Sequence, residues 1–358
     1  MNVSLAAHLS KVNQPVPSKK LITVSCLGDS ITAGSFNYPH SSSIWYPTYA
    51  NHLLARDSTV TRTCGDNRFI SDQAALSPGS SLSRSEFTLA ASSATPYSKV
   101  EMSHRGLLPV DEGLYLLQGE LIGNLSIGAH LAVGVYGVDH DDQIVEDSWQ
   151  FAGSYEVDRL GYAKVSYTFS PRFIASLDPT IVKVGIGGLL ESEGQISMGQ
   201  LRNIQLSALS SGIAIHNQGV SYTSVAEGLA TIGKVIRWQP DVCIVAYGTN
   251  DIRNGVSWED YCTDLVQLVN TLREHRIFPI IATLPPLGKD QVNYDQVPAW
   301  NELITAKANE LGIGLWDRWQ AFYKGDLSFI EDGRHPTRKG YLRLGEDLVR
   351  FLSEAMLR

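Results

Sequence analysis

Short apolar runs alternate with longer amphipathic stretches at both ends of the chain. The short runs are apolar on both faces, which is typical of buried strands, whereas the longer stretches have the apolar spacing of helices. Strands are expected at residues 21–27, 213–215, 242–247, 277–284 and 313–316, and helices at 45–56, 223–238, 258–275, 298–311 and 337–357. This alternation predicts an α/β fold whose parallel sheet is covered by helices on each face.

The middle of the chain has another pattern. Short β-type runs separated by Gly and Asp occupy residues 114–122, 130–138, 163–169, 181–186 and 201–209. Within residues 165–169, apolar and polar side chains alternate with the period of two that a half-buried strand requires. The pattern predicts an antiparallel β-sandwich of roughly 100 residues. Residues 77–98, rich in Ser, Ala and Pro, are expected to form a linker or loose loop.

The two patterns together predict one domain inserted into another. The first strand and helix, at residues 21–56, have no partner unless the α/β region is a single domain that the β-rich stretch interrupts. We therefore expect a discontinuous α/β domain of residues 1–60 and 212–358, with an inserted linker and β-sandwich domain at residues 61–211. The two ends of a domain often lie close together, so inserting the β-rich domain would disturb the α/β domain little. The length of 358 residues also exceeds the roughly 250–300 residues at which single cores stop growing.

Composition and charge narrow the functional classes. Lys and Arg number 29 and Asp and Glu number 37, so the net charge is −8, and the chain has no basic run. Binding to nucleic acid or to an anionic membrane is therefore not expected. No apolar stretch reaches the ~20 residues of a membrane span, and residues 1–20 lack the apolar core of a secretory signal. Four cysteines without a CxxC pair predict no disulfide scaffold, and the compartment and the oligomeric state stay open.

Residues with catalytic potential follow four of the predicted strands. Ligands of open α/β sheets bind at the carboxyl ends of the strands, so the residues after each strand gather at one edge. They are Ser30 after the first strand, Gly219 after the second, Asn250 after the third, and Asp332 and His335 beyond the last. A serine, a histidine and a carboxylate at one edge supply the parts needed for acyl transfer.

Each of these residues fits one role in acyl transfer. Ser30 is the expected nucleophile, and His335 is the expected base because an imidazole titrates near neutrality. Asp332, three residues before His335, can hold the far ring nitrogen and stabilise the imidazolium. The backbone N–H groups of Ser30 and Gly219 and the Asn250 amide can donate to the oxyanion, each contributing roughly 3–4 kcal/mol. In the alternative interpretation, Ser30 is a helix N-cap and Asn250 shapes a turn.

The order of these blocks resembles that of the GDSL/SGNH hydrolase superfamily of serine esterases and lipases. The resemblance is carried by Gly28-Asp29-Ser30, Gly219, Gly248-Thr249-Asn250-Asp251 and Asp332-x-x-His335-Pro336. It implies a three-layer α/β/α flavodoxin-like fold, a triad of Ser30, His335 and Asp332, and an oxyanion hole formed by Ser30, Gly219 and Asn250. It also implies no metal and no cofactor. The acidic run at residues 139–142 resembles a cluster of metal ligands, but it falls where a hairpin turn is expected and is interpreted as a solvated turn.

Two departures from that superfamily bear on the substrate. Tyr222 stands near the position where compact relatives often have a second glycine, and the β-sandwich separates the first two blocks. The sandwich resembles the jelly-roll-like carbohydrate-binding modules attached to such enzymes, so the inserted domain is expected to bind carbohydrate. Trp45, Tyr46 and Tyr222 are expected to line the substrate pocket.

The favoured interpretation is a serine esterase that works through an acyl-enzyme and removes O-acetyl groups from a carbohydrate. Its expected partner is an acetylated carbohydrate or another small ester. Two alternatives stay open, namely a lipid or thioester hydrolase and a glycan-binding adhesin with an inactive hydrolase fold. Fold and triad alone do not fix the substrate.

Overall fold

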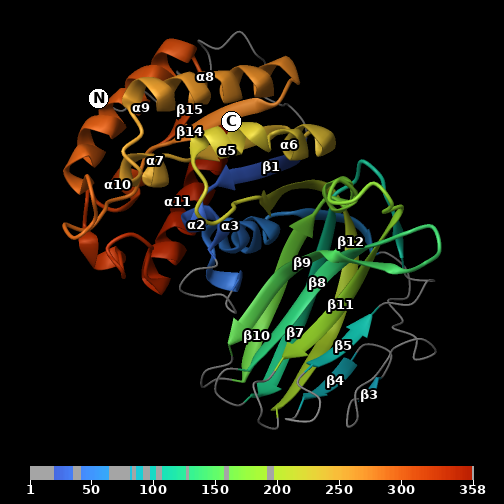
Figure 1. The fold of residues 1–358 in the computed structure, drawn as a ribbon. Coiled ribbons are helices and arrows are strands. Elements are labelled where there is room, and N and C mark those ends of the chain that lie inside the picture. Colours follow the sequence, from blue (N-terminus) through green and yellow to red (C-terminus); the bar gives the residue numbers. More distant parts are fainter. Residues whose placement is uncertain are drawn as a thin grey trace. The chain divides into compact units, whose positions relative to one another are not determined.

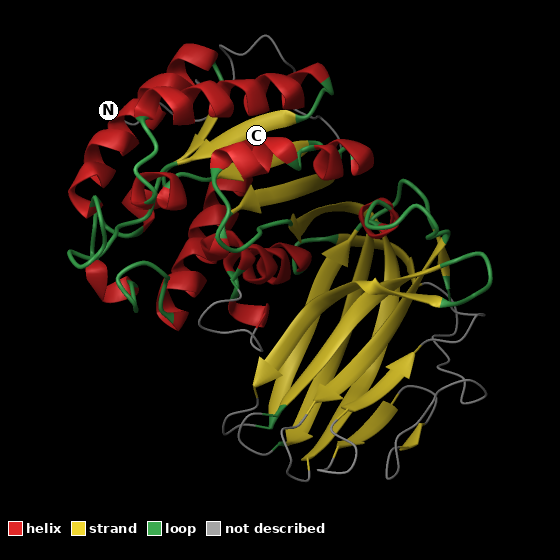
Figure 2. Cartoon of the chain, in the orientation of Figure 1, coloured by secondary structure: helices red, strands yellow, loops and turns green. Residues whose placement is uncertain are grey.

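The computed structural model divides the chain into two compact units (Figures 1 and 2). The α/β unit consists of residues 1–39, 44–50 and 215–358, and the β unit consists of residues 40–43 and 51–214. The domain boundaries expected at residues 60 and 212 stay predictions. The structure describes residues 20–34, 42–63, 81–82, 86–91, 97–101, 107–125, 129–156, 161–191 and 197–356.

A mostly parallel sheet forms the centre of the α/β unit. Its strands are, in spatial order, β12 (Ser197–Asn217), β1 (Leu21–Gly28), β13 (Val242–Ala246), β14 (Phe278–Ala282) and β15 (Gly314–Trp316). β13 pairs in parallel with both β1 and β14, and β14 pairs in parallel with β15. Every residue of β13 and β14 is buried, as expected for apolar strands that are covered on both faces.

Helices cover both faces of this sheet (Figure 1). One face shares a hydrophobic core with α5 (Val225–Ala230), α6 (Gly233–Trp238), α8 (Trp258–Glu274) and α9 (Val297–Leu311). On the other face, Trp316 of β15 joins α3 (Tyr46–Ala55) and α11 (Arg338–Met356). The Trp316 ring lies 5.4 Å from that of Tyr46, and its Nε1 donates to Asp347 Oδ2 at 2.9 Å. The predicted three-layer α/β fold is therefore confirmed.

Short helices begin where the strands of this sheet end. α2 (Ser30–Ala33) follows β1, α7 (Thr249–Arg253) follows β13, and α10 (Arg318–Ala321) follows β15. The parallel register places Gly28 of β1 opposite Ala246 of β13. The residues that follow these two strands therefore emerge side by side at one edge of the sheet. In the described part of the chain, no helix combines the length and apolar character needed to cross a membrane.

The β unit contains two antiparallel sheets. One sheet joins β12 to β2 (Thr59–Thr63), β3 (Ser81–Leu82), β4 (Glu86–Ala91), β7 (Tyr115–Asn124) and β10 (Tyr162–Phe169). The other has the order β5 (Tyr97–Glu101), β11 (Lys183–Glu191), β8 (His130–Val138) and β9 (Ile144–Glu156), with β6 (Leu108–Pro109) also paired to β11. Leu131 of β8 lies against Gly199 of β12, so the two sheets pack face to face. The predicted antiparallel part is confirmed, whereas its likeness to a jelly roll stays a prediction.

Three predictions of secondary structure were wrong in detail. Residues 81–82 and 86–91, expected to lie in a loop, are strands because β4 pairs with β12 and buries Leu89. The single helix expected at residues 223–238 is divided into α5 and α6. The two strands expected at residues 201–209 and 213–215 are parts of one strand, β12. A short helix that was not expected from the sequence, α4 (Pro171–Ala175), also lies in the β-rich stretch.

Candidate active site

Ser30 lies on a tight turn between β1 and α2. Asp29 caps this helix, because its Oδ1 accepts a hydrogen bond from the Ile31 N–H at 3.0 Å. The alternative in which Ser30 is itself the cap is therefore wrong. The helix ends after one turn at Gly34, whose N–H donates to the Ser30 carbonyl oxygen at 2.8 Å. The turn holds Ser30 at the carboxyl edge of the sheet.

A tight loop before α11 holds Asp332 and His335 together. Asp332 Oδ1 accepts hydrogen bonds from the backbone N–H groups of Arg334 at 3.2 Å and His335 at 2.7 Å. The Glu331 N–H donates to the His335 carbonyl oxygen at 2.9 Å and closes the loop. With Oδ1 occupied by the backbone, the other carboxylate oxygen of Asp332 is directed to the imidazole.

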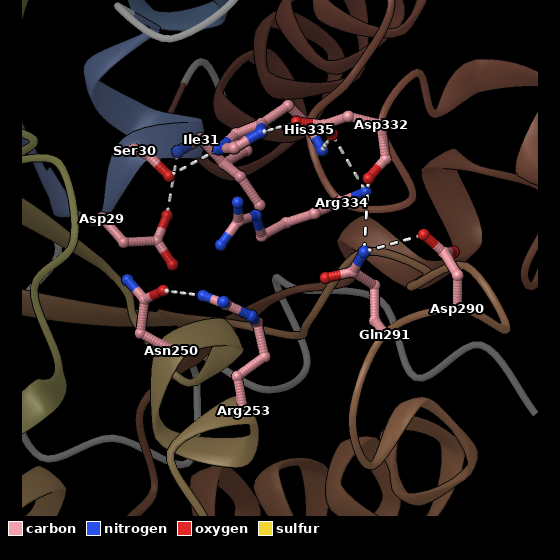
Figure 3. A network of polar contacts seen from close by, with 10 residues as sticks. All are labelled: Asp29, Ser30, Ile31, Asn250, Arg253, Asp290, Gln291, Asp332, Arg334 and His335. Atoms are coloured by element: carbon pink, nitrogen blue, oxygen red, sulfur yellow. Dashed lines mark hydrogen bonds and ion pairs between the residues drawn. The ribbon is translucent and has the colours of Figure 1, made fainter.

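Two hydrogen bonds join Ser30, His335 and Asp332 in series (Figure 3). Ser30 Oγ lies 2.9 Å from His335 Nε2, and His335 Nδ1 lies 2.6 Å from Asp332 Oδ2. Ser30 and His335 are 305 positions apart in the sequence, so only the fold brings them together. When Nδ1 donates to the carboxylate, Nε2 is left to accept the Ser30 proton.

The surroundings favour a neutral imidazole and an ionised carboxylate. Burial lowers the pKa of His335, the guanidiniums of Arg334 and Arg253 add to this effect, and the Asp332 carboxylate opposes it. Burial acts to raise the pKa of Asp332, but hydrogen bonds from His335 outweigh it, so the net shift is downward. A neutral imidazole in contact with a hydroxyl is the form that can act as a general base.

Asn250 lies in the first turn of α7, after β13. The helix is preceded by Gly248, whose φ of 122° favours glycine. Asn250 Nδ2 donates to the Thr223 carbonyl oxygen at 2.9 Å, and its Oδ1 accepts from Arg253 Nη1 at 3.3 Å. An amide nitrogen carries two hydrogens, so the second hydrogen can serve a ligand. Asp251 ties α7 to the start of α5, because its Oδ1 accepts the Val225 N–H at 3.1 Å.

The Gly219 N–H is engaged within its own turn. It donates to Asn217 Oδ1 at 3.0 Å, and Asn217 Nδ2 donates to the Thr32 carbonyl oxygen at 2.8 Å. A Cβ at Gly219 would lie 2.3 Å from the backbone nitrogen of Ala33, so this close approach to α2 requires glycine. Gly219 thus lies beside the turn that carries Ser30, and its role as an oxyanion donor stays a prediction.

The three aromatic residues expected to line the pocket have different surroundings. Tyr46 is fully buried and its hydroxyl lies 3.0 Å from Thr32 Oγ1, which leaves it no exposed surface for a substrate. The Trp45 ring lies against Gly34 at the end of α2. Tyr222 is 64% exposed and takes a positive φ of 67°. Of the three, Tyr222 therefore offers the most accessible aromatic surface.

Three polar residues near Ser30, Gly219 and Asn250 were not predicted from the sequence, namely Asn217, Arg253 and Arg334. Asn217 holds the Gly219 N–H. Arg253 contacts Asn250, and Figure 3 shows its guanidinium and that of Arg334 pointing into the space beside Ser30. The sequence positions of the two arginines could have indicated that they lie near the site. Arg253 follows Asn250 by almost one helical turn, and Arg334 directly precedes His335.

No metal site is apparent in the described residues. They contain no group of three or more His, Cys, Asp or Glu side chains that could hold a metal ion. The acidic run at residues 139–142 forms a turn in which Asp139 Oδ1 accepts the backbone N–H groups of Asp141 at 2.9 Å and Gln143 at 2.8 Å. The interpretation of this run as a turn is confirmed.

A hydroxyl, an imidazole and a carboxylate joined in series at the carboxyl edge of an α/β sheet are the arrangement typical of serine hydrolases. Residues 200–343 match the model of the GDSL-like lipase/acylhydrolase family. This part of the chain belongs to that family, as the sequence blocks predicted, and the protein is an esterase. The matched residues include Asn250, Asp332 and His335, whereas Ser30 lies outside them.

Several solved structures are similar to this one. A peptidoglycan O-acetylesterase is 13% identical with a TM-score of 0.47, and 99% of this chain and 95% of that chain are covered. An acetylxylan esterase from Geobacillus stearothermophilus is 20% identical with a TM-score of 0.37, covering 40% of this chain and 73% of that chain. A GDSL-like lipase from Bacteroides thetaiotaomicron is 19% identical with a TM-score of 0.35, covering 40% and 75%. No curated protein sequence matches the chain significantly. Likenesses this distant do not identify a substrate.

Proposed function

We propose that Ser30 attacks the carbonyl carbon of an ester while His335 takes the serine proton. The observation that supports this most strongly is the 2.9 Å contact between Ser30 Oγ and His335 Nε2. The Asp332 carboxylate stabilises the imidazolium that forms. The imidazolium then gives its proton to the oxygen of the leaving alcohol, and the acyl group stays on Ser30.

Release of the acyl group repeats these steps with water. His335 takes a proton from water, the oxygen attacks the acyl carbon, and the proton returns to Ser30 as the acid leaves. In both steps, the developing oxyanion accepts hydrogen bonds from the Ser30 backbone N–H and from the second amide hydrogen of Asn250. Gly219 becomes a third donor when its N–H exchanges the Asn217 side chain for the substrate.

The proposed substrate is an O-acetylated carbohydrate. Ser30 and His335 are only 4% and 1% exposed, so a small acyl group fits against them better than a long one. Several polar or charged groups lie near them, which suits a hydroxyl-rich sugar better than a fatty chain. In Figure 3 these groups are Asp29, Asn250, Arg253 and Arg334.

A series of p-nitrophenyl esters of increasing acyl length tests this choice. We expect kcat/KM to fall at least about tenfold from acetate to octanoate, and acetate to be released from acetylated polysaccharides. Ser30→Ala serves as the background for both assays. Activity that rises with chain length would favour the lipid hydrolase instead. A folded protein that turns over no ester would contradict the esterase mechanism and favour the adhesin.

A further inference from the structure

Two guanidinium groups flank the catalytic residues. Arg253, on α7, contacts the Asn250 side chain at 3.3 Å, and Arg334 lies in the loop that carries Asp332 and His335. Figure 3 shows that both side chains extend toward the space beside Ser30, from two separate segments of the chain. Both guanidiniums act electrostatically on His335, so their closeness is not an effect of the view.

Charges of both signs surround the catalytic residues. Besides burial, Arg334 and Arg253 lower the pKa of His335, whereas Asp332 raises it, and the Asp29 carboxylate beside Ser30 interacts with Arg334. Burial and the positive charge of Arg334 lower the pKa of Arg253 more than the Asp332 carboxylate raises it, so the two cations oppose each other's charge. Both residues are partly buried, which reduces the screening of this repulsion by water. An anion placed between them would relieve it.

We propose that Arg253 and Arg334 bind a carboxylate of the substrate, and that the enzyme acts on acetylated acidic sugars such as uronic acids. Guanidinium groups suit this task because their paired N–H donors match the two oxygens of a carboxylate. Arg334 adjoins His335, which protonates the leaving alcohol, so the carboxylate belongs to the sugar and not to the acyl group. This inference rests on the proposed esterase function.

Arg334 also has a possible structural role that the test must separate. Its positive charge opposes the rise in the pKa of Asp29 that burial produces, so its loss could disturb the Ser30 turn. A disturbed turn would lower kcat/KM for every substrate by the same factor. Loss of a carboxylate contact would lower it for acidic sugars only. The ratio of kcat/KM between two matched substrates therefore distinguishes the two roles.

The experiment compares acetate release from an O-acetylated methyl glucuronide and from the matching O-acetylated methyl glucoside. We expect the native enzyme to prefer the acidic sugar by about 10–100-fold, the range for a charge-assisted hydrogen bond. Arg334→Gln should remove most of this preference, largely through KM for the acidic sugar. Arg253→Gln should also lower the ratio, while slowing both substrates because Arg253 contacts Asn250. Arg334→Lys should keep part of the preference.

Arg237→Gln is the matched control. It removes the same charge from an exposed site near the end of α6, at the opposite edge of the sheet from the catalytic residues, and should leave the ratio unchanged. Equal rates on the two sugars, or an equal loss on both in Arg334→Gln, would overturn the inference and leave the esterase intact. Failure to release acetate from either sugar or from p-nitrophenyl acetate would instead contradict the proposed function.

Discussion

Polar side chains have different partners at two places in the two units. In the β unit, the buried side chains of Asn51 and Ser148 bind backbone groups of the same unit. Asn51 Nδ2 donates to the Thr168 carbonyl oxygen at 2.8 Å, and Asn51 Oδ1 accepts from the Thr168 N–H at 2.8 Å. Ser148 Oγ accepts from the Gly137 N–H at 2.6 Å. These bonds satisfy buried backbone groups and so stabilise the fold.

In the α/β unit, three side chains at the carboxyl edge of the sheet bind one another. Ser30, His335 and Asp332 are linked through side-chain atoms. Two of the buried histidines, His52 and His335, show this difference. Burial lowers the pKa of His52 in the β unit to about 4, and its ring contacts a backbone carbonyl. Burial also lowers the pKa of His335, but a carboxylate opposes this shift. Burial and a carboxylate partner alone do not identify a site, because buried His130 of the β unit lies 3.1 Å from Glu191 Oε2. His335 also contacts a serine hydroxyl through its other ring nitrogen, and this series of three groups identifies the candidate site.

The largest expected effect comes from removing a member of the Ser30–His335 pair. Ser30→Ala or His335→Ala should lower kcat by roughly 10⁴–10⁶-fold, because neither residue can replace the other in proton transfer. The unfolding temperature should change little. Acetate release and thermal unfolding measured on the same samples test this. Turnover within about tenfold of the native rate in Ser30→Ala would show that another group is the nucleophile.

A smaller loss is expected at Asn250. Asn250→Ala removes one oxyanion donor and should lower kcat by about 10²–10³-fold with little change in KM. Asn254→Ala, at the exposed end of the same helix, is the matched control and should leave kcat unchanged. Steady-state kinetics on p-nitrophenyl acetate provide the measurement. Equal effects of the two substitutions would remove Asn250 from the oxyanion hole.

In the β unit, a substitution of a buried polar residue is expected to lower stability and leave kcat unchanged. Asn51→Ala breaks three hydrogen bonds to Thr168 and leaves buried groups of Thr168 without partners. The free energy of unfolding should fall by about 2–4 kcal/mol, while kcat on a small ester stays unchanged. Denaturant unfolding and kinetics of one preparation measure both quantities. A folded Asn51→Ala protein with greatly reduced kcat would contradict the contrast between the units.

The smallest effect concerns pH. The base must be neutral to act, so kcat/KM should rise with pH and reach half its maximum below ~6.5, the usual pKa of an imidazole, because burial lowers the pKa of His335. Asp332→Asn removes the charge that opposes this shift and should move the half-maximum to lower pH, with a loss of kcat smaller than that of Ser30→Ala. A half-maximum that moves upward in Asp332→Asn would contradict the assigned base.

Much of the α/β unit was predictable because its strands and helices carry local signals. Apolar runs in the sequence predict β1, β13 and β14. The residues that follow the strands predict which side chains form the candidate site. Tertiary contacts account for what was missed. β4 has the composition of a loop and becomes a strand only by pairing with β12. Tyr46 has an aromatic ring suited to a pocket, but its helix turns the ring toward Trp316 and the core.

The sequence predicted which residues form the candidate site better than it predicted the contacts between them. The sequence contains Gly219 at a strand end, but not the hydrogen bond that engages its N–H with Asn217. It contains Arg253 and Arg334 without showing that their guanidiniums lie beside the same imidazole. The relation between the two arginines joins segments that are far apart in the chain, so the sequence alone does not reveal it.

Covalent labelling with a fluorophosphonate tests the central claim most directly, since this reagent reacts with a serine that a neighbouring base activates. We predict one label per native chain, located at Ser30 by peptide mass spectrometry, with labelling abolished in Ser30→Ala and strongly slowed in folded His335→Ala. Labelling at another residue, or no labelling of the folded native protein, would contradict the account.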